Sequence, residues 1–323
     1  MTRTSVDLSL EVAGLHLPNP IGLAAGLDKN AEAVPAWFAL GFGSVEVGTL
    51  TPLPQTGNPR PRLFRIPSHQ ALINRMGFNN CGCGEAADRL GALRWRPGPV
   101  GANIGKNKDT PLENATQDYL RCIDRLAKVS DYLVINASSP NTPGLRQLQE
   151  RQRLAQLLQA TRAHLKVRAP ARPLFLKIAP DLGPEAVDEI VDIACAQQID
   201  GLVATNTTLA RPFDGRWSSE EGGLSGAPLR PISTRIIHRI YARSAGRLPI
   251  FGVGGVFCAD QAYEKIRAGA SVVQLYTGLI YQGPGLVRRM LASLALLLNR
   301  DGFRSVTEAV GADHRSVQRP AHL

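Results

Sequence analysis

One pattern recurs eight times along this chain: a short apolar segment ends in polar or glycine residues, and an amphipathic stretch follows it. The apolar segments begin at residues 20, 44, 100, 132, 174, 201, 249 and 272. Helical periodicity lies between them, for example at 118–129, 184–198 and 259–269. Because eight strand–helix units in one chain favour closure over an open sheet, the sequence predicts an α/β fold of the (β/α)8 TIM-barrel class.

The regular spacing suggests one domain, residues 1–323, with a few additions. The alternating segment 8–17 predicts a small N-terminal β-hairpin that closes the bottom of the barrel. The spacing breaks once, at residues 50–99 after the second strand, and an insertion of that length is expected to act as a substrate lid. We expect the apolar run 290–299 to form a buried helix and residues 301–323 to be a short C-terminal tail.

Composition and charge exclude several classes of protein. No segment approaches the roughly 18 to 20 apolar residues that span a bilayer, and the first residues lack a secretory pattern. Five cysteines without regular spacing indicate a reduced, cytoplasmic protein. The net charge of +10 is dispersed, with no basic run, so it suits anionic small ligands and predicts no nucleic-acid partner.

The carboxyl ends of the predicted strands carry amides and hydroxyls, and this is where barrels of this class place their active sites. The set comprises Lys29, Thr49, Asn103, Asn136, Ser139, Lys177, Thr205, Asn206, Gly254, Gly255, Tyr276 and Thr277. None of the six histidines is among them, and Asp28 is the one acid in these loops. The pattern therefore predicts no metal site and disfavours both metal-assisted hydrolysis and histidine acid–base catalysis.

Two features of this set indicate an anionic ligand. Lys177 lies within an apolar strand, where a lysine cannot easily reach solvent and needs a negative partner, such as a reduced flavin. The segment GVGG at 252–255 offers unobstructed backbone N–H groups after the seventh strand, where barrels commonly bind phosphate. Phe257 stands where a dinucleotide fingerprint would need a third glycine, so the pattern favours a phosphate monoester.

Eight collinear motifs resemble the dihydroorotate dehydrogenase family over residues 8–300: GLAAGLDKN, INRMGFNN, NIGKNKDTP, NASSPNTPGLR, LKIAPDL, ATNTTL, GGLSGAPL, and GVGG with QLYTGLI. Ser139 stands where the soluble branch has cysteine, so the resemblance is to the quinone-linked, class 2 branch. The resemblance implies FMN-dependent oxidation of (S)-dihydroorotate to orotate in pyrimidine (UMP) biosynthesis. It also implies a quinone acceptor, a monomer, and a cytoplasmic location, peripheral at the inner face of the cell membrane as in the family.

The resemblance also implies roles for individual residues. FMN contacts are implied for Ala25, Gly26, Leu27, Asp28, Lys29, Thr49, Asn103, Asn136, Lys177, Thr205, Gly226, Gly255, Tyr276 and Thr277. Substrate contacts are implied for Lys29, Asn74, Arg75, Met76, Gly77, Phe78, Asn136, Asn141, Asn206 and Thr207. Catalytic roles are implied for Ser139, Thr142 and Lys29.

Ser139 matches the catalytic base of the family, in the polar turn NASSPNTPG at 136–144. A serine hydroxyl is a weak base and needs somewhere to pass its proton. Thr142, three residues on, is expected to relay the proton through water. Pro140 and Pro143 stiffen the turn, which suits a proton transfer that depends on placement.

Two alternatives remain open on the sequence. A dihydrouridine-synthase-like FMN reductase would suit the basic charge, but it would need a catalytic cysteine and a C-terminal RNA-binding domain, and neither is evident. A non-catalytic flavin- or phosphate-binding barrel is the other, and the presence of Ser139, Lys29 and Lys177 argues against it.

The quinone-linked branch carries an N-terminal helical extension that docks on the membrane. About twenty residues precede the first strand here, and they are expected to form the hairpin. On this reading, membrane contact is doubtful, and short soluble quinones should serve better than long-tailed ones. NAD is not expected to serve, because no dinucleotide fingerprint is present.

Overall fold

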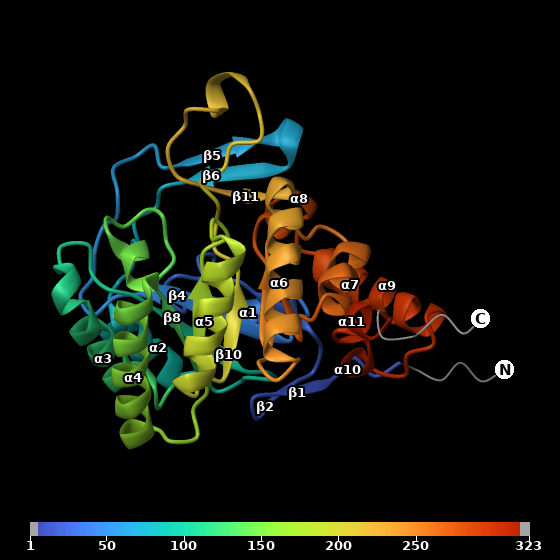
Figure 1. The fold of residues 1–323 in the computed structure, drawn as a ribbon, viewed down its shortest axis with the longest axis horizontal. Coiled ribbons are helices and arrows are strands. Elements are labelled where there is room, and N and C mark those ends of the chain that lie inside the picture. The colour runs from blue at the N-terminus through green and yellow to red at the C-terminus, as the bar shows by residue number, and fades with distance from the viewer. Residues whose placement is uncertain (1–5, 317–323) are drawn as a thin grey trace.

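In the computed structural model, which describes residues 6–316, eight parallel strands close into a barrel (Figure 1). In hydrogen-bonded order they are β10 (Gly201–Ala204), β12 (Ile250–Val253), β13 (Val272–Leu275), β3 (Ile21–Leu23), β4 (Ser44–Leu50), β7 (Val100–Ile104), β8 (Tyr132–Asn136) and β9 (Leu174–Ile178), which pairs again with β10. Each strand begins at the predicted residue or one residue after it. The predicted TIM barrel is confirmed.

Helices follow the strands and cover the outside of the barrel (Figure 1). They are α1 (Val34–Ala39), α2 (Cys83–Gly91), α3 (Ala115–Leu126), α4 (Arg151–Arg168), α5 (Pro184–Ala196), α6 (Arg230–Ser244), α7 (Ala259–Arg267), α8 (Thr277–Gln282) and α9 (Leu286–Arg300). Short 3-10 turns are η1 (Pro67–His69), η2 (Leu112–Asn114), η3 (Leu145–Gln149), η4 (Gly215–Trp217) and η5 (Ala227–Leu229). The apolar run 290–299 lies in a helix as expected, but the helix is only partly buried: Leu294 and Leu298 are buried and Leu296 is 62% exposed, so α9 is amphipathic.

Aromatic rings fill the amino-terminal end of the barrel interior. Tyr132, Phe175 and Phe251 are fully buried near the starts of their strands, with ring centroids 4.6 to 5.6 Å apart. Such packing makes this end a solid hydrophobic core rather than a pore. The polar side chains of the barrel therefore gather toward its other end.

Two strands near the N-terminus, β1 (Leu10–Val12) and β2 (Leu15–Leu17), form the predicted antiparallel hairpin. The insertion contains β5 (Leu63–Ile66) and β6 (Ala71–Asn74), which lie above the barrel in Figure 1. A second excursion, residues 205–226, carries β11 (Gly223–Gly226), which pairs antiparallel with β6. The expectation of a single break in the spacing was therefore wrong, because two insertions build one three-stranded sheet, β11–β6–β5.

The chain after α9 packs on the barrel through residue 316. It forms α10 (Val306–Ala309) and α11 (Ala312–Ser316), and the N–H of Gly311 donates to the carbonyl of Ile266 at 3.0 Å. The predicted tail is thus an integral part of the fold over this span, and its residues 317–323 lie outside the described residues. Between residues 6 and 316, no helix is both long and apolar enough to cross a membrane.

Candidate functional site

A cavity with about 940 Å³ of empty space opens at the carboxyl ends of the barrel strands, beneath the small sheet. Most residues predicted for the site line it: Ala25, Gly26, Lys29, Thr49, Asn74, Met76, Gly77, Phe78, Asn136, Ser139, Asn141, Lys177, Thr205, Asn206, Thr207, Gly226, Gly255, Tyr276 and Thr277. The insertion and the strand ends thus meet at one place.

Five predicted residues do not line this cavity: Leu27, Asp28, Arg75, Asn103 and Thr142. The carboxylate of Asp28 accepts hydrogen bonds from the N–H groups of Glu32 and Ala33, at 2.8 and 2.9 Å, and from the Trp37 indole at 3.2 Å. Asp28 therefore holds the start of α1, and a direct ligand contact by its side chain is not supported.

Arg75 points away from the cavity, although its neighbours in the sequence line it. Its guanidinium forms an ion pair with Glu220 and lies 4.6 Å from the centre of the Phe64 ring. These contacts tie β6 to the second excursion. The predicted substrate contact of Arg75 is thus not supported, and the side chain instead braces the small sheet.

A network of amides lies at the base of the cavity. Asn136 donates from Nδ2 to Thr49 Oγ1 at 2.8 Å and to Asn103 Oδ1 at 3.1 Å. Thr49 in turn donates to Asn103 Oδ1 at 2.6 Å. Asn103 therefore acts from behind the cavity wall and orients the two side chains that face the ligand.

The network ends on a carboxylate that the sequence reasoning missed. Glu46 is fully buried in β4 and accepts from Asn103 Nδ2 at 2.8 Å and from Gln274 Nε2 at 2.6 Å. The available signal was an acid inside an apolar strand, the same signal that singled out Lys177. Burial lowers the pKa of Lys177, whose side chain is 5% exposed, and the Glu46 carboxylate opposes that shift.

The turn after β8 carries Ser139 at the cavity wall, 5% exposed. Its hydroxyl accepts a hydrogen bond from the N–H of Asn141 at 3.2 Å. Arg146, also missed from the sequence, donates to the carbonyls of Ser138 and Thr207 at 3.1 and 3.0 Å. These bonds fix the turn against the next polar loop, so Ser139 is held rigidly.

Lys29 brings positive charge to the wall near the insertion. Burial lowers the pKa of its amine to about 8, with a smaller contribution in the same direction from the Arg62 guanidinium. The cavity wall thus carries two amines, those of Lys29 and Lys177. Together with the amides of Asn74, Asn141 and Asn206, they suit a ligand with a carboxylate and imide edges.

The opposite end of the cavity is glycine-rich. Gly254 and Gly255 have φ of +130° and +69°, and a Cβ at Gly255 would lie 2.6 Å from Cβ of Arg230. Nearby, the hydroxyls of Ser225 and Thr277 lie 2.8 Å apart at the same wall. Backbone N–H groups and hydroxyls without acids are a donor set suited to phosphate.

No group of three or more His, Cys, Asp or Glu side chains suited to a metal ion occurs among residues 6–316. Chemistry at this site therefore has to be assigned to the amides, hydroxyls and lysines of the cavity, together with whatever ligand they hold.

Comparison with known proteins gives a family. The dihydroorotate dehydrogenase family model matches residues 7–298 of the 323. The chain belongs to the dihydroorotate dehydrogenase family. It is therefore an oxidoreductase that oxidises dihydroorotate in pyrimidine biosynthesis.

Relatives within this family are similar over nearly the whole chain. Dihydroorotate dehydrogenase (quinone) of Myxococcus xanthus is 62% identical, over 97% of this chain and 86% of that protein. The protein of the same name from Anaeromyxobacter dehalogenans is 60% identical, over 95% of this chain and 86% of that protein. The crystal structure of ligand-free DHODH from Eimeria tenella has a TM-score of 0.91 at 43% identity, covering 99% of this chain and 94% of that one.

A flavin, on which this family depends, is compatible with the residues of the cavity. The glycine turn leaves room for a phosphate, and Lys177 offers a cation within the barrel. Amides of Asn136 and its neighbours offer both donors and acceptors to a ring with imide edges.

Proposed function

We propose that this protein converts (S)-dihydroorotate to orotate using FMN, with Ser139 as the catalytic base and a quinone as the electron acceptor. The observation that carries the proposal is that Ser139, Lys177 and the Gly254–Gly255 turn line one cavity. When bound, the flavin supplies the two-electron acceptor for the hydride that leaves C6 of the substrate. The chain itself supplies the base, the binding groups and the exclusion of water.

Ser139 takes the proton from C5 of the substrate. Loss of this proton and of the C6 hydride forms the C5=C6 double bond of orotate. A serine hydroxyl is a weak base, so the rate depends on its placement, which the bonds of Arg146 to the turn and the Asn141 N–H maintain. The proton passes on to water. A relay through Thr142 stays a prediction, because its buried side chain does not line the cavity.

Lys29 holds the substrate carboxylate, and the amides of Asn74, Asn141 and Asn206 hold its ring. Asn141 donates to Asn74 Oδ1 at 3.2 Å, so the turn and the insertion form one binding surface. Met76 and Phe78 line the same wall and exclude water from the reacting carbons.

Lys177, Thr49, Asn136 and Thr205 hold the flavin ring, and the glycine turn holds the phosphate. Lys177 places a positive charge in a buried site, where it favours an electron-rich ring over an oxidised one. The absence of a third glycine at Phe257 favours FMN over a dinucleotide.

The quinone acceptor is supported by the names of the Myxococcus and Anaeromyxobacter relatives, both dihydroorotate dehydrogenase (quinone). A monomer, a cytoplasmic location and weak membrane contact remain predictions from the sequence.

Two measurements test the proposal. Flavin released by heat should run as FMN on chromatography, and FAD or an absence of flavin would contradict the cofactor. Under anaerobic conditions, dihydroorotate should bleach the flavin absorption, and a tail-less quinone should restore it. A flavin that stays oxidised with dihydroorotate would favour the non-catalytic barrel instead.

A further inference from the structure

Lys265 is a fully buried lysine that the proposed reaction does not use. It lies in α7, is 0% exposed, and donates from Nζ to Ser233 Oγ at 2.9 Å and Thr234 Oγ1 at 3.0 Å on α6. The neighbouring carboxylate of Glu264 pairs with Arg230 at 3.6 Å rather than with this amine. Lys265 thus has two neutral hydroxyl partners.

A buried amine with only neutral partners is costly to the fold. Burial lowers the pKa of Lys265 to about 7, with Glu264 and Arg230 acting in opposite directions. A methionine would fill the same space between α6 and the barrel without desolvating a charge, and such replacements are often neutral or stabilising. Packing alone therefore does not account for a lysine here, and a nearby anion would.

Contacts from Lys265 lead to the glycine turn of the cavity. Ser233, which accepts from the amine, donates from Oγ to the carbonyl of Val253 at 2.6 Å. Val253 ends β12 and directly precedes Gly254 and Gly255. Cβ of Ser233 lies 3.0 Å from where a Cβ at Gly254 would be. The side chain of Ser233 therefore lies between the amine of Lys265 and the Gly254–Gly255 turn.

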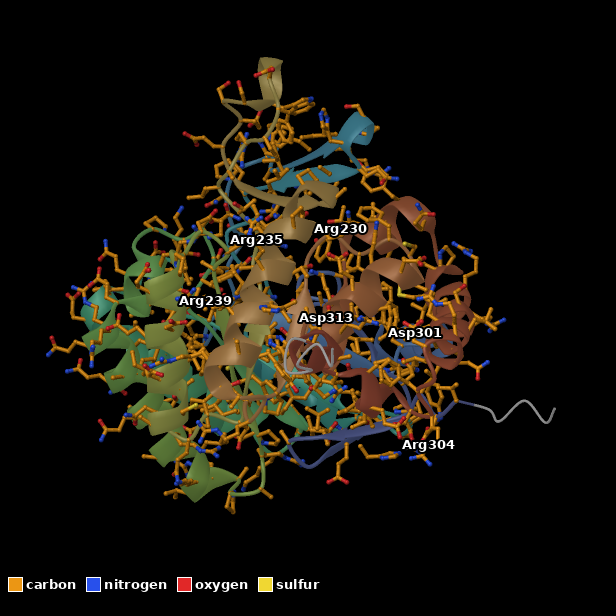
Figure 2. All side chains as sticks on the ribbon, turned by 45° about the vertical axis from the view of Figure 1, so that its right-hand side comes forward. Arg230, Arg235, Arg239, Asp301, Arg304 and Asp313 are labelled. Carbon is orange, nitrogen blue, oxygen red and sulfur yellow. The ribbon has the colours of Figure 1, made fainter. Side chains whose placement is uncertain are left out.

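One further contact places Lys265 at this end of the barrel. Cδ of Lys265 lies 3.6 Å from where a Cβ at Gly252 would be, so the lysine packs on the back of β12. Arg230, which flanks the turn, lies at the end of α6 nearest the small sheet, whereas Arg239 lies farther along the helix (Figure 2). The lysine and the cavity thus approach the same turn from opposite sides.

We propose that Lys265 is a positioning residue for the cofactor phosphate, acting as a buried counter-charge behind the Gly254–Gly255 turn. This inference rests on the proposed use of FMN. The charge acts across a dry, packed wall, where electrostatic interactions are screened less than in water. Through Ser233, the amine also fixes the carbonyl of Val253, so the N–H groups of the turn stay directed at the cavity.

The test compares FMN with riboflavin, which has the same ring and no phosphate. The FMN-loaded protein is incubated with increasing riboflavin, and the bound flavin at equilibrium gives the ratio of the two dissociation constants. Lys265→Gln keeps hydrogen-bonding capacity without charge, and Lys265→Met removes both. Both should lower the preference for FMN, on the order of ten- to a hundredfold for one charge beside a phosphate dianion. Riboflavin affinity should stay near that of the parent.

Lys106→Met is the matched control. Lys106 is also buried, at 2% exposure, but its amine donates to the carbonyls of Asn107, Lys108 and Thr110, and it does not line the cavity. Its loss should lower stability without changing the FMN-to-riboflavin ratio. An equal fall of the ratio in this control would overturn the role of Lys265.

The remaining outcomes separate this inference from the proposed function. If the parent prefers FMN strongly and Lys265→Gln retains that preference, the proposed role of Lys265 as a counter-charge is excluded and the proposed function stands. This conclusion holds whether or not Lys265→Met folds. If the parent itself binds riboflavin as tightly as FMN, the proposed phosphate site fails and this inference fails with it.

Discussion

The side-chain amide of Asn141 donates a hydrogen bond to the side-chain carbonyl of Asn74 at 3.2 Å. Asn74 ends β6 in the insertion, and Asn141 lies in the turn that carries Ser139. Asn58 adds a second link, donating to the carbonyls of Arg75 at 3.0 Å and Asn141 at 3.4 Å. The small sheet is thus joined to the turn that carries Ser139 by half-buried polar bonds, which suits a cover that opens and closes.

Asn74→Ala should weaken substrate binding while leaving the flavin in place. It removes a ligand contact and the bond to Asn141, each worth roughly 1 kcal/mol, so the dissociation constant of dihydroorotate should rise about tenfold or more. The change is measured with the product orotate: the protein is titrated with orotate, and the flavin spectrum reports how much is bound. Leu63→Ala is the control. Leu63 pairs with Asn74 across β5 and β6, but it is 45% exposed and does not line the cavity. The affinity of this variant for orotate should therefore match that of the parent protein.

Proteolysis gives an independent test of the same cover. Orotate should slow protease cleavage within residues 50–82 of the insertion. Cleavage at an unchanged rate would argue that this segment is a fixed wall.

The barrel and most of the cavity could be predicted from sequence because both follow from local patterns. Each strand is an apolar segment of the sequence, so the residues at its carboxyl end can be identified from the sequence alone. The pairing of β11 with β6 could not be predicted, because it joins residues about 150 positions apart through short strands without a strong period. Sequence position alone also could not show that Asp28 and Arg75 do not line the cavity, since adjacent residues of a loop point in different directions.

Ser139→Ala should bind orotate normally and reduce the flavin about 10²- to 10⁴-fold more slowly, because a positioned base is lost. Anaerobic stopped-flow mixing with dihydroorotate measures the rate. Ser139→Cys should regain part of it, increasingly at high pH, where more thiolate is present. An alanine variant that reduces flavin at the parental rate would exclude Ser139 as the base.

Lys29 should make substrate affinity depend on pH. Its amine is charged below its pKa, which burial sets at about 8, and a charged amine favours the substrate carboxylate. Affinity for orotate should therefore be full near pH 7 and fall above pH 8, approaching tenfold per pH unit. Lys29→Arg, which stays charged, should remove this fall, and Lys29→Met should bind weakly at every pH. A parent affinity that is flat from pH 7 to 9 would contradict the assignment.

Lys177→Met should make the flavin harder to reduce. The amine of Lys177 is a buried cation that lines the cavity, and its loss removes stabilisation of the electron-rich ring more than of the oxidised ring. The midpoint potential, measured by spectroelectrochemistry, should become more negative, and flavin content should drop. An unchanged potential in a fully loaded variant would show that Lys177 does not act on the ring.

Gly255→Ala should release the flavin, whereas Gly283→Ala should not. Both glycines have positive φ, +69° at Gly255 and +74° at Gly283, where ψ is −179°, so alanine brings conformational strain of about 1 to 3 kcal/mol at either site. Their surroundings differ. A Cβ at Gly255 would lie 2.6 Å from Cβ and 2.7 Å from the backbone N of Arg230, whereas nothing lies within 4 Å of one at Gly283. Gly255→Ala must therefore shift the turn that holds the phosphate, and its flavin content after purification should fall well below that of Gly283→Ala. Equal loss of flavin in both variants would mean that backbone strain, rather than the shape of the turn, governs cofactor retention.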